Sequence, residues 1–83
     1  SLSCLDLRVY PNPVRDFLIL EIQAYASNEV CHYRIYDAFG RQITSGKLLF
    51  WKTELDLNEL EAGVYLLRLE RNGCHRTHKL VKQ

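Results

Sequence analysis

The sequence predicts an all-β fold, namely an immunoglobulin-like seven-stranded antiparallel β-sandwich. Apolar and polar residues alternate with a period of two in short segments, as they do on half-buried strands. Proline, glycine, asparagine and aspartate interrupt these segments at short intervals. The chain has 83 residues, which suits one such domain. We therefore take residues 1–83 as a single domain in which residues 1–4 are linker.

The first two strands are expected over residues 5–10 and 17–22. Pro11 and Pro13 end the first strand, because neither proline nitrogen can donate a hydrogen bond to a neighbouring strand. The second strand is apolar on both faces except at Glu21, so it is expected in the middle of a sheet.

The third and fourth strands are expected over residues 30–36 and 41–49, joined by a tight hairpin. Asp37 can accept hydrogen bonds from the backbone amides of that turn, and Gly40 can take the positive φ that closes it. The third-strand residues expected to face inward are Cys31, Tyr33 and Ile35, and those expected to face outward are His32 and Arg34.

Residues 51–57 form a further alternating strand, and residues 58–63 are expected to make one helical turn. In that turn Asn58 is the candidate N-cap and Gly63 the left-handed terminator. Leu60 is then expected to point downward and close the end of the sandwich.

The last two strands are expected over residues 64–70 and 75–82, connected by an Asn72-Gly73 hairpin. Tyr65 is expected to point inward and to donate its hydroxyl hydrogen to backbone near the start of its strand, as in a tyrosine corner. The chain also has aromatic residues that could form a sugar-binding platform: Tyr10, Tyr25, Tyr33, Tyr36, Phe39, Trp51 and Tyr65. Core packing is the more usual role of strand aromatics. Phe39, at a hairpin tip, and Trp51, at a strand start, are the two that we most expect to be exposed.

Composition argues against several classes of function. A net charge of +1 gives no reason to expect nucleic acid as a partner. The longest apolar stretch, residues 17–20, is far too short to span a bilayer as a helix. The chain contains no methionine and begins Ser1-Leu2-Ser3, so we expect it to be a C-terminal module excised from a larger protein.

The residues that could carry chemistry are not arranged for it. On a strand, His75 and His78 point to opposite faces, as do Cys31 and His32, so no metal site is expected. Cys74 and its neighbour His75 diverge for the same reason, and the acidic residues show no paired spacing. We expect no catalytic residue and no cofactor. The three cysteines can form at most one disulfide, and we take them as small hydrophobic residues.

Four short signatures follow one another along the chain. They are Tyr10-Pro11-Asn12-Pro13, the segment from Ile35 to Arg41 with Asp37 and Gly40, the segment from Leu55 to Tyr65 ending in Ala62-Gly63-Val64-Tyr65, and the basic end Lys79-Leu80-Val81-Lys82-Gln83. In this order they resemble the C-terminal sorting domain, type A, of the bacterial type IX secretion system. The resemblance extends roughly from Val9 to the end of the chain.

The resemblance implies a domain that directs a passenger protein across the outer membrane of a Gram-negative bacterium. The implied partners are outer-membrane translocation or shuttle proteins, a sortase that usually cleaves the domain off, and a passenger upstream in the same chain. It also implies passage through the periplasm to the cell surface or the medium. The recognition residues expected are Gly40, Arg41, Lys79, Leu80, Val81 and Lys82. A role in the fold is expected for Pro11, Asn12, Pro13, Asp37, Gly63 and Tyr65.

Recognition has a physical basis if residues 75–82 form an exposed sheet edge, because a receptor strand could add to its unpaired backbone groups. Lys79 and Lys82 would pair with acidic groups, and Arg41 would offer a planar donor beside the hairpin. The alternative at Gly40-Arg41 is a hairpin with a solvated arginine and no further role. The alternative for the whole chain is an immunoglobulin-like cell-surface module that binds carbohydrate or protein.

Overall fold

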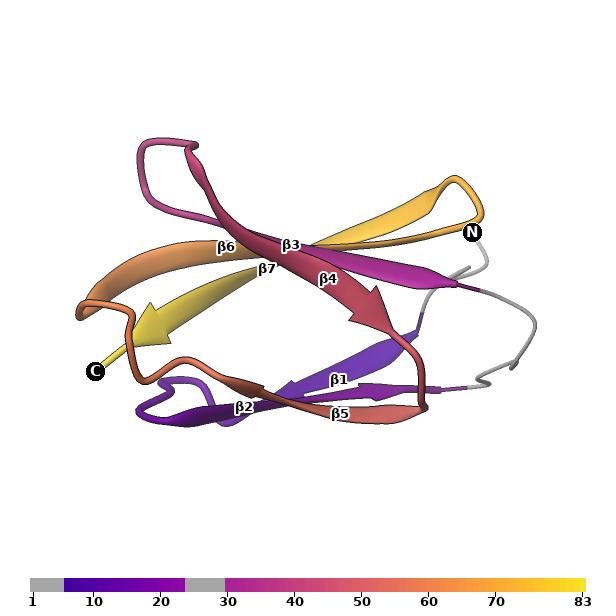
Figure 1. The fold of residues 1–83 in the computed structure, drawn as a ribbon, viewed down its shortest axis with the longest axis horizontal. Helices are drawn as coiled ribbons and strands as arrows, with labels where there is room; N and C mark the ends of the chain where they lie inside the picture. Colours follow the sequence, from indigo (N-terminus) through magenta and orange to yellow (C-terminus); the bar gives the residue numbers. More distant parts are fainter. Residues whose placement is uncertain (1–5, 24–29) are drawn as a thin grey trace.

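The computed structural model describes residues 6–23 and 30–83, and every regular element in these ranges is a β-strand (Figure 1). The strands are β1 (Leu7–Tyr10), β2 (Phe17–Ile22), β3 (Cys31–Tyr36), β4 (Gln42–Leu48), β5 (Lys52–Asp56), β6 (Gly63–Arg71) and β7 (Cys74–Lys82).

The strands form two facing sheets, which confirms the predicted β-sandwich (Figure 1). One sheet has the order β1-β2-β5 and the other the order β4-β3-β6-β7, with all neighbours antiparallel. As predicted, β2 is the central strand of its sheet. In the immunoglobulin constant type the fourth strand of the chain belongs to the sheet of the first strand. Here β4 pairs with β3 and extends the other sheet.

The core lies between the sheets and is built from the inward positions of both. Its buried apolar residues are Val14, Leu18, Leu20, Ile22, Cys31, Ile35, Leu48, Leu55, Leu57, Tyr65, Leu67, Leu69 and Leu80. The inward side of β3 is as predicted at Cys31 and Ile35, which are buried, while Tyr33 packs partly against the core. Leu60 also packs against the core from the turn before β6, as expected.

The predicted helical turn is wrong. The segment that follows β5 contains turns, and no helix occurs in the described parts of the chain. Asp56 Oδ1 accepts a hydrogen bond of 2.9 Å from the Asn58 amide. The Leu60 amide, which an N-cap at Asn58 could bond, donates instead to the Leu57 carbonyl oxygen at 3.1 Å. Gly63 has φ 156° and is the first residue of β6, where it does not terminate a helix. The amides at the start of this segment are therefore bonded within a turn, by the Asp56 side chain and the Leu57 backbone.

Two further expectations concern exposure and the cysteines. Phe39 and Trp51 are exposed, at 95% and 55%, as predicted. Cys74 is disulfide-bonded, so the description of all three cysteines as independent hydrophobic residues is wrong, although Cys31 is a free and buried thiol. Burial raises the pKa of the Cys31 thiol. Cys4, residues 1–4 as a linker, Leu5 in the first predicted strand, and Tyr25 lie outside the described residues.

Candidate functional site at the signature end

The four sequence signatures meet at one end of the sandwich, which we call the signature end. This end holds the β1–β2 connection, the β3–β4 hairpin, the β5–β6 connection and the C-terminal half of β7 (Figure 1). Gly63 and Tyr65 of the third signature pair with Lys82 and Leu80 of the fourth. The antiparallel topology therefore brings together segments that are far apart in sequence, such as Asn12 and Val81, which are hydrogen-bonded with a separation of 69 residues.

The first signature fastens the last strand. Asn12 donates from Nδ2 to the Lys79 carbonyl oxygen at 2.7 Å and accepts at Oδ1 from the Val81 amide at 3.0 Å. Val14 then donates to the Val81 carbonyl and accepts from the Gln83 amide, each at 2.8 Å. The peptide bonds before Pro11 and Pro13 are both cis. Asn12 of the first signature and the following Val14 thus occupy the outer edge of the chain from Lys79 to Gln83.

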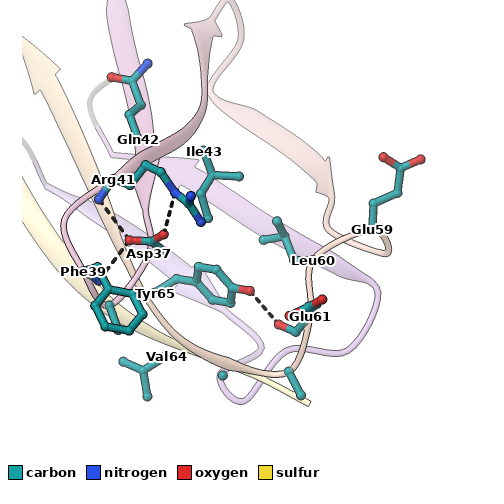
Figure 2. A pocket seen from close by; sticks show the side chains of 13 residues that line it. Asp37, Phe39, Arg41, Gln42, Ile43, Glu59, Leu60, Glu61, Val64 and Tyr65 are labelled. Carbon is teal, nitrogen blue, oxygen red and sulfur yellow. Dashed lines mark hydrogen bonds and ion pairs between the residues drawn. The ribbon is translucent and has the colours of Figure 1, made fainter.

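The second signature is organised by one carboxylate. Asp37 is 9% exposed, and its Oδ1 accepts hydrogen bonds of 2.9 Å from the amides of Phe39 and Arg41 (Figure 2). Its Oδ2 accepts a bond of 3.0 Å from Arg41 Nε. The Arg41 amide, followed by the Phe39 amide and the Arg41 side chain, holds the pKa of Asp37 below its ordinary value despite its partial burial. Gly40 has φ 84°, so the predicted hairpin and its positive φ are confirmed.

The third signature contains the predicted tyrosine corner. The Tyr65 hydroxyl donates to the Glu61 carbonyl oxygen at 2.6 Å, four residues upstream, while its ring lies among the buried residues (Figure 2). This bond fixes the chain as it enters β6. The amide of Leu57 also donates to the Asp16 carbonyl at 2.7 Å, which ties the β5–β6 connection to the β1–β2 connection.

A cavity of about 560 Å³ separates the second signature from the third. On one side it is lined by the hairpin from Asp37 to Ile43, and on the other by the segment from Glu59 to Tyr65 (Figure 2). Arg41 stands at this cavity with 81% of its side chain exposed, held by Asp37 through Nε. The site therefore offers a positioned guanidinium beside apolar side chains, which is an arrangement for binding rather than for proton or group transfer.

The expected recognition residues occupy different environments. Arg41 and Lys79 are exposed, and Val81 is half-buried. Leu80 is 1% exposed and belongs to the core, while Lys82 is 8% exposed, with Nζ donating to the Gln83 carbonyl oxygen at 3.1 Å. The signature end thus brings Arg41 and Lys79 to the surface but not Leu80 or Lys82.

Sequence reasoning missed how the edge of β7 is covered. The strand is an edge strand, as expected, but its outer side is already bonded to Asn12 and Val14. The bonded backbone groups are the Lys79 carbonyl, the Val81 amide and carbonyl, and the Gln83 amide. Strand addition at this half of β7 would first have to displace the first signature. The sequence feature that could have indicated this is Asn12, which lies between Pro11 and Pro13. Its side chain has both a donor and an acceptor, and neither proline can extend a strand.

In residues 6–23 and 30–83, no group of three or more histidine, cysteine or acidic residues could hold a metal ion. Within the same residues, no helix is long and apolar enough to cross a membrane.

Comparison with known proteins gives the same result as the four signatures. Residues 8–83 match the family described as the secretion system C-terminal sorting domain, which is not an enzyme family. No match was found among curated proteins. The family match does not favour the alternative of a carbohydrate- or protein-binding surface module. The chain belongs to the family of secretion system C-terminal sorting domains, and its function is that of a type IX secretion sorting signal.

Proposed function

We propose that the type IX translocation machinery recognises this domain at the folded signature end, with Arg41 and Lys79 as the side chains that it contacts. The single observation behind this proposal is that four segments distant in sequence meet at one end of the sandwich. A receptor that binds there would bind only the folded domain, because misfolding of either sheet would separate these segments.

Arg41 has the geometry of a contact residue. Its Nε bond to Asp37 fixes the direction of the guanidinium, so less conformational entropy is lost when a partner binds. With 81% of the side chain exposed, the group is accessible to a carboxylate or a backbone carbonyl of a partner. Lys79 is the exposed basic residue of the last strand on the same end, and its carbonyl oxygen is already held by Asn12.

The burial of Leu80 and Lys82 assigns them a different role in this proposal. They keep β7 in the sandwich, so that removing them would disturb the fold before it disturbed a receptor contact. Gly40 allows the hairpin to close and presents Arg41. Recognition then depends on exposed side chains, and the backbone edge from Lys79 to Gln83 stays bonded to Asn12 and Val14.

The partners that this role requires are an outer-membrane translocation or shuttle protein and a sortase that removes the domain after transport. The passenger precedes the domain in the same chain and reaches the cell surface or the medium by way of the periplasm. No part of this proposal requires a cofactor.

A reporter fusion tests the proposal. A periplasmic reporter is given a signal peptide and residues 1–83 at its C-terminus, and is expressed in a host with a working type IX system. We expect the reporter in the medium or on the cell surface, and in the periplasm when the domain is left out. Retention of the fusion in the periplasm, while a known sorting domain exports the same reporter, would overturn it.

A further inference from the structure

The outer face of the four-stranded sheet carries a cluster of basic residues that strand register places side by side. Arg34 of β3 lies opposite Ser45 of β4 and opposite Arg68 of β6. One row further along, His32 lies opposite Lys47 and Glu70. All of these positions alternate with the inward core positions of the same strands, so their side chains share the outer face.

The positive charges of this face are only partly balanced. Arg34 forms an ion pair with Glu70 at 4.0 Å, and Glu70 is the acidic residue of the two rows. Arg68 stands directly opposite Arg34, an arrangement that is destabilising for like charges on adjacent strands. Its Nε is buried and has no hydrogen-bond acceptor within the described part of the molecule. Lys47 adds an exposed charge on β4, so the face has an unbalanced positive charge that an anionic surface would neutralise.

The same outer face continues into exposed apolar residues toward the signature end. Leu66 of β6 lies opposite Tyr36 and Lys79, and it is 41% exposed. Val64, two residues earlier on the same face, is 43% exposed. Phe39 at the hairpin tip lines the same cavity as Val64 (Figure 2). A basic half and an apolar half therefore adjoin on one side of the sheet.

The outer face of the three-stranded sheet differs in charge pattern. Arg8, Glu21 and Lys52 lie in one row and alternate in sign, and the next outward positions of β5 are the acidic residues Glu54 and Asp56. Arg8 lies 5.5 Å from the centre of the Tyr10 ring, and Lys52 lies 5.9 Å from the centre of the Trp51 ring. Positive charge here is balanced within the domain, and this face supplies matched control residues.

We propose that the outer face of β4-β3-β6-β7 binds the surface of a bilayer that contains anionic lipids. Basic side chains attract anionic headgroups, and exposed aromatic and aliphatic side chains enter the boundary between headgroups and acyl chains. A soluble acidic protein would account for the basic half of the face but not for the apolar half with Phe39 at its tip. This inference does not rest on Arg41, although Phe39 and Lys79 lie where the two proposed surfaces meet.

Vesicle binding by the purified domain tests the proposal. One set of vesicles is phosphatidylcholine alone, and the other contains about one third phosphatidylglycerol as the anionic lipid. The domain is expected to sediment with the anionic vesicles only, and its binding should weaken as salt screens the charges. The double variant Lys47→Gln and Arg68→Gln is expected to bind roughly 25-fold more weakly, at about fivefold per charge removed.

The control double variant, Arg8→Gln with Lys52→Gln, removes the same net charge from the opposite face. Its binding is expected to change by less than about twofold, because charges beyond a Debye length from the bilayer are screened. Lys47→Glu, at an exposed position, repeats the test without altering the partly buried Arg68. Thermal melting of each variant confirms that it is folded.

The variant Phe39→Ser separates a bilayer from a soluble polyanion. It is expected to weaken vesicle binding severalfold while leaving the salt dependence unchanged, since it removes an apolar contact and no charge. Equal binding of Phe39→Ser and the original domain would overturn the proposal. So would binding to neutral vesicles, absence of binding to both vesicle types, an equal loss in the control double variant, or binding to soluble polyglutamate but not to anionic vesicles.

Discussion

The two ends of the sandwich are built in different ways. At the signature end, side chains of Asn12, Asp37, Asp56 and Tyr65 bond to backbone and fix each connection. At the opposite end, the β6–β7 hairpin turns on Asn72 and Gly73, whose φ values of 52° and 77° match the predicted Asn-Gly turn. The β4–β5 connection there exposes Leu49, Phe50 and Trp51.

This difference explains why most of the signature residues are recognisable in sequence. A turn held by a side chain needs one residue type at one position, whereas a hairpin of two residues accepts several combinations. Much of what identifies the family in this chain is therefore required for folding one end. Arg41 and Lys79 are exposed residues of the same signatures, which is why we place recognition on them.

The largest expected effect concerns the last strand. Leu80→Ala should lower the free energy of unfolding by about 2–5 kcal/mol, because Leu80 is buried in the core. Lys79→Ala, one residue away and exposed, should change it by less than about 0.5 kcal/mol. Urea unfolding of the two variants measures both values. Equal losses would mean that β7 does not hold its register in solution.

The hairpin at Gly40 should be nearly as sensitive. A Cβ at this position would contact nothing within 4 Å, so the cost of Gly40→Val comes from its φ of 84° alone. We expect a loss of about 1–3 kcal/mol. Gly40→Asn should lose less, since asparagine tolerates this conformation better. Thermal melts compare the two, and a stable Gly40→Val would show that the hairpin changes shape in solution.

The tyrosine corner should make a smaller contribution. Tyr65→Phe keeps the buried ring and removes the hydroxyl that donates to the Glu61 carbonyl. The expected loss is about 1 kcal/mol, the net value of one hydrogen bond. Unfolding by urea measures it, with Tyr36→Phe on the outer face as the control. No loss in Tyr65→Phe would mean that water replaces the hydroxyl at Glu61.

Asp37 should give the domain a pH dependence at the signature end. Its pKa is lower in the folded state than in the unfolded chain, so its stabilising effect is fully present above the unfolded value of about 3.9. That effect is lost as the pH falls through the folded pKa. Asp37→Asn keeps an oxygen for the two amides but loses the ion pair, so it should reduce the melting temperature slightly at neutral pH. The melting temperature of Asp37→Asn should also depend less on pH in the acidic range than that of the original domain. An equal pH dependence of the two proteins would contradict the role assigned to Asp37.

The sequence contained most of the fold but little of the geometry of the site. Strand positions followed from alternation, and the φ of Gly40 and the bond of Tyr65 followed from turn chemistry, because these depend on residues close in sequence. Sheet order did not follow, and neither did the pairing of Asn12 and Val14 with β7, since both depend on contacts between distant segments. The basic outer face could not be predicted either, because the net charge of +1 is a sum over both faces and the residues of this face come from different strands. The predicted helical turn at Asn58 did not form, because the Leu60 amide, which an N-cap at Asn58 could bond, donates instead to the Leu57 carbonyl oxygen.

The most direct test of recognition at the signature end is the exported fraction of the reporter fused to the Arg41→Ala domain. Because Arg41 is largely exposed, the free energy of unfolding of this variant should lie within about 0.5 kcal/mol of that of the original domain. Lys52→Ala, an exposed cation outside the signatures, is the matched control. The account predicts that Arg41→Ala is folded and exported severalfold less, while Lys52→Ala is exported normally. Normal export of a folded Arg41→Ala fusion would contradict the account and leave Arg41 as a solvated residue of the hairpin.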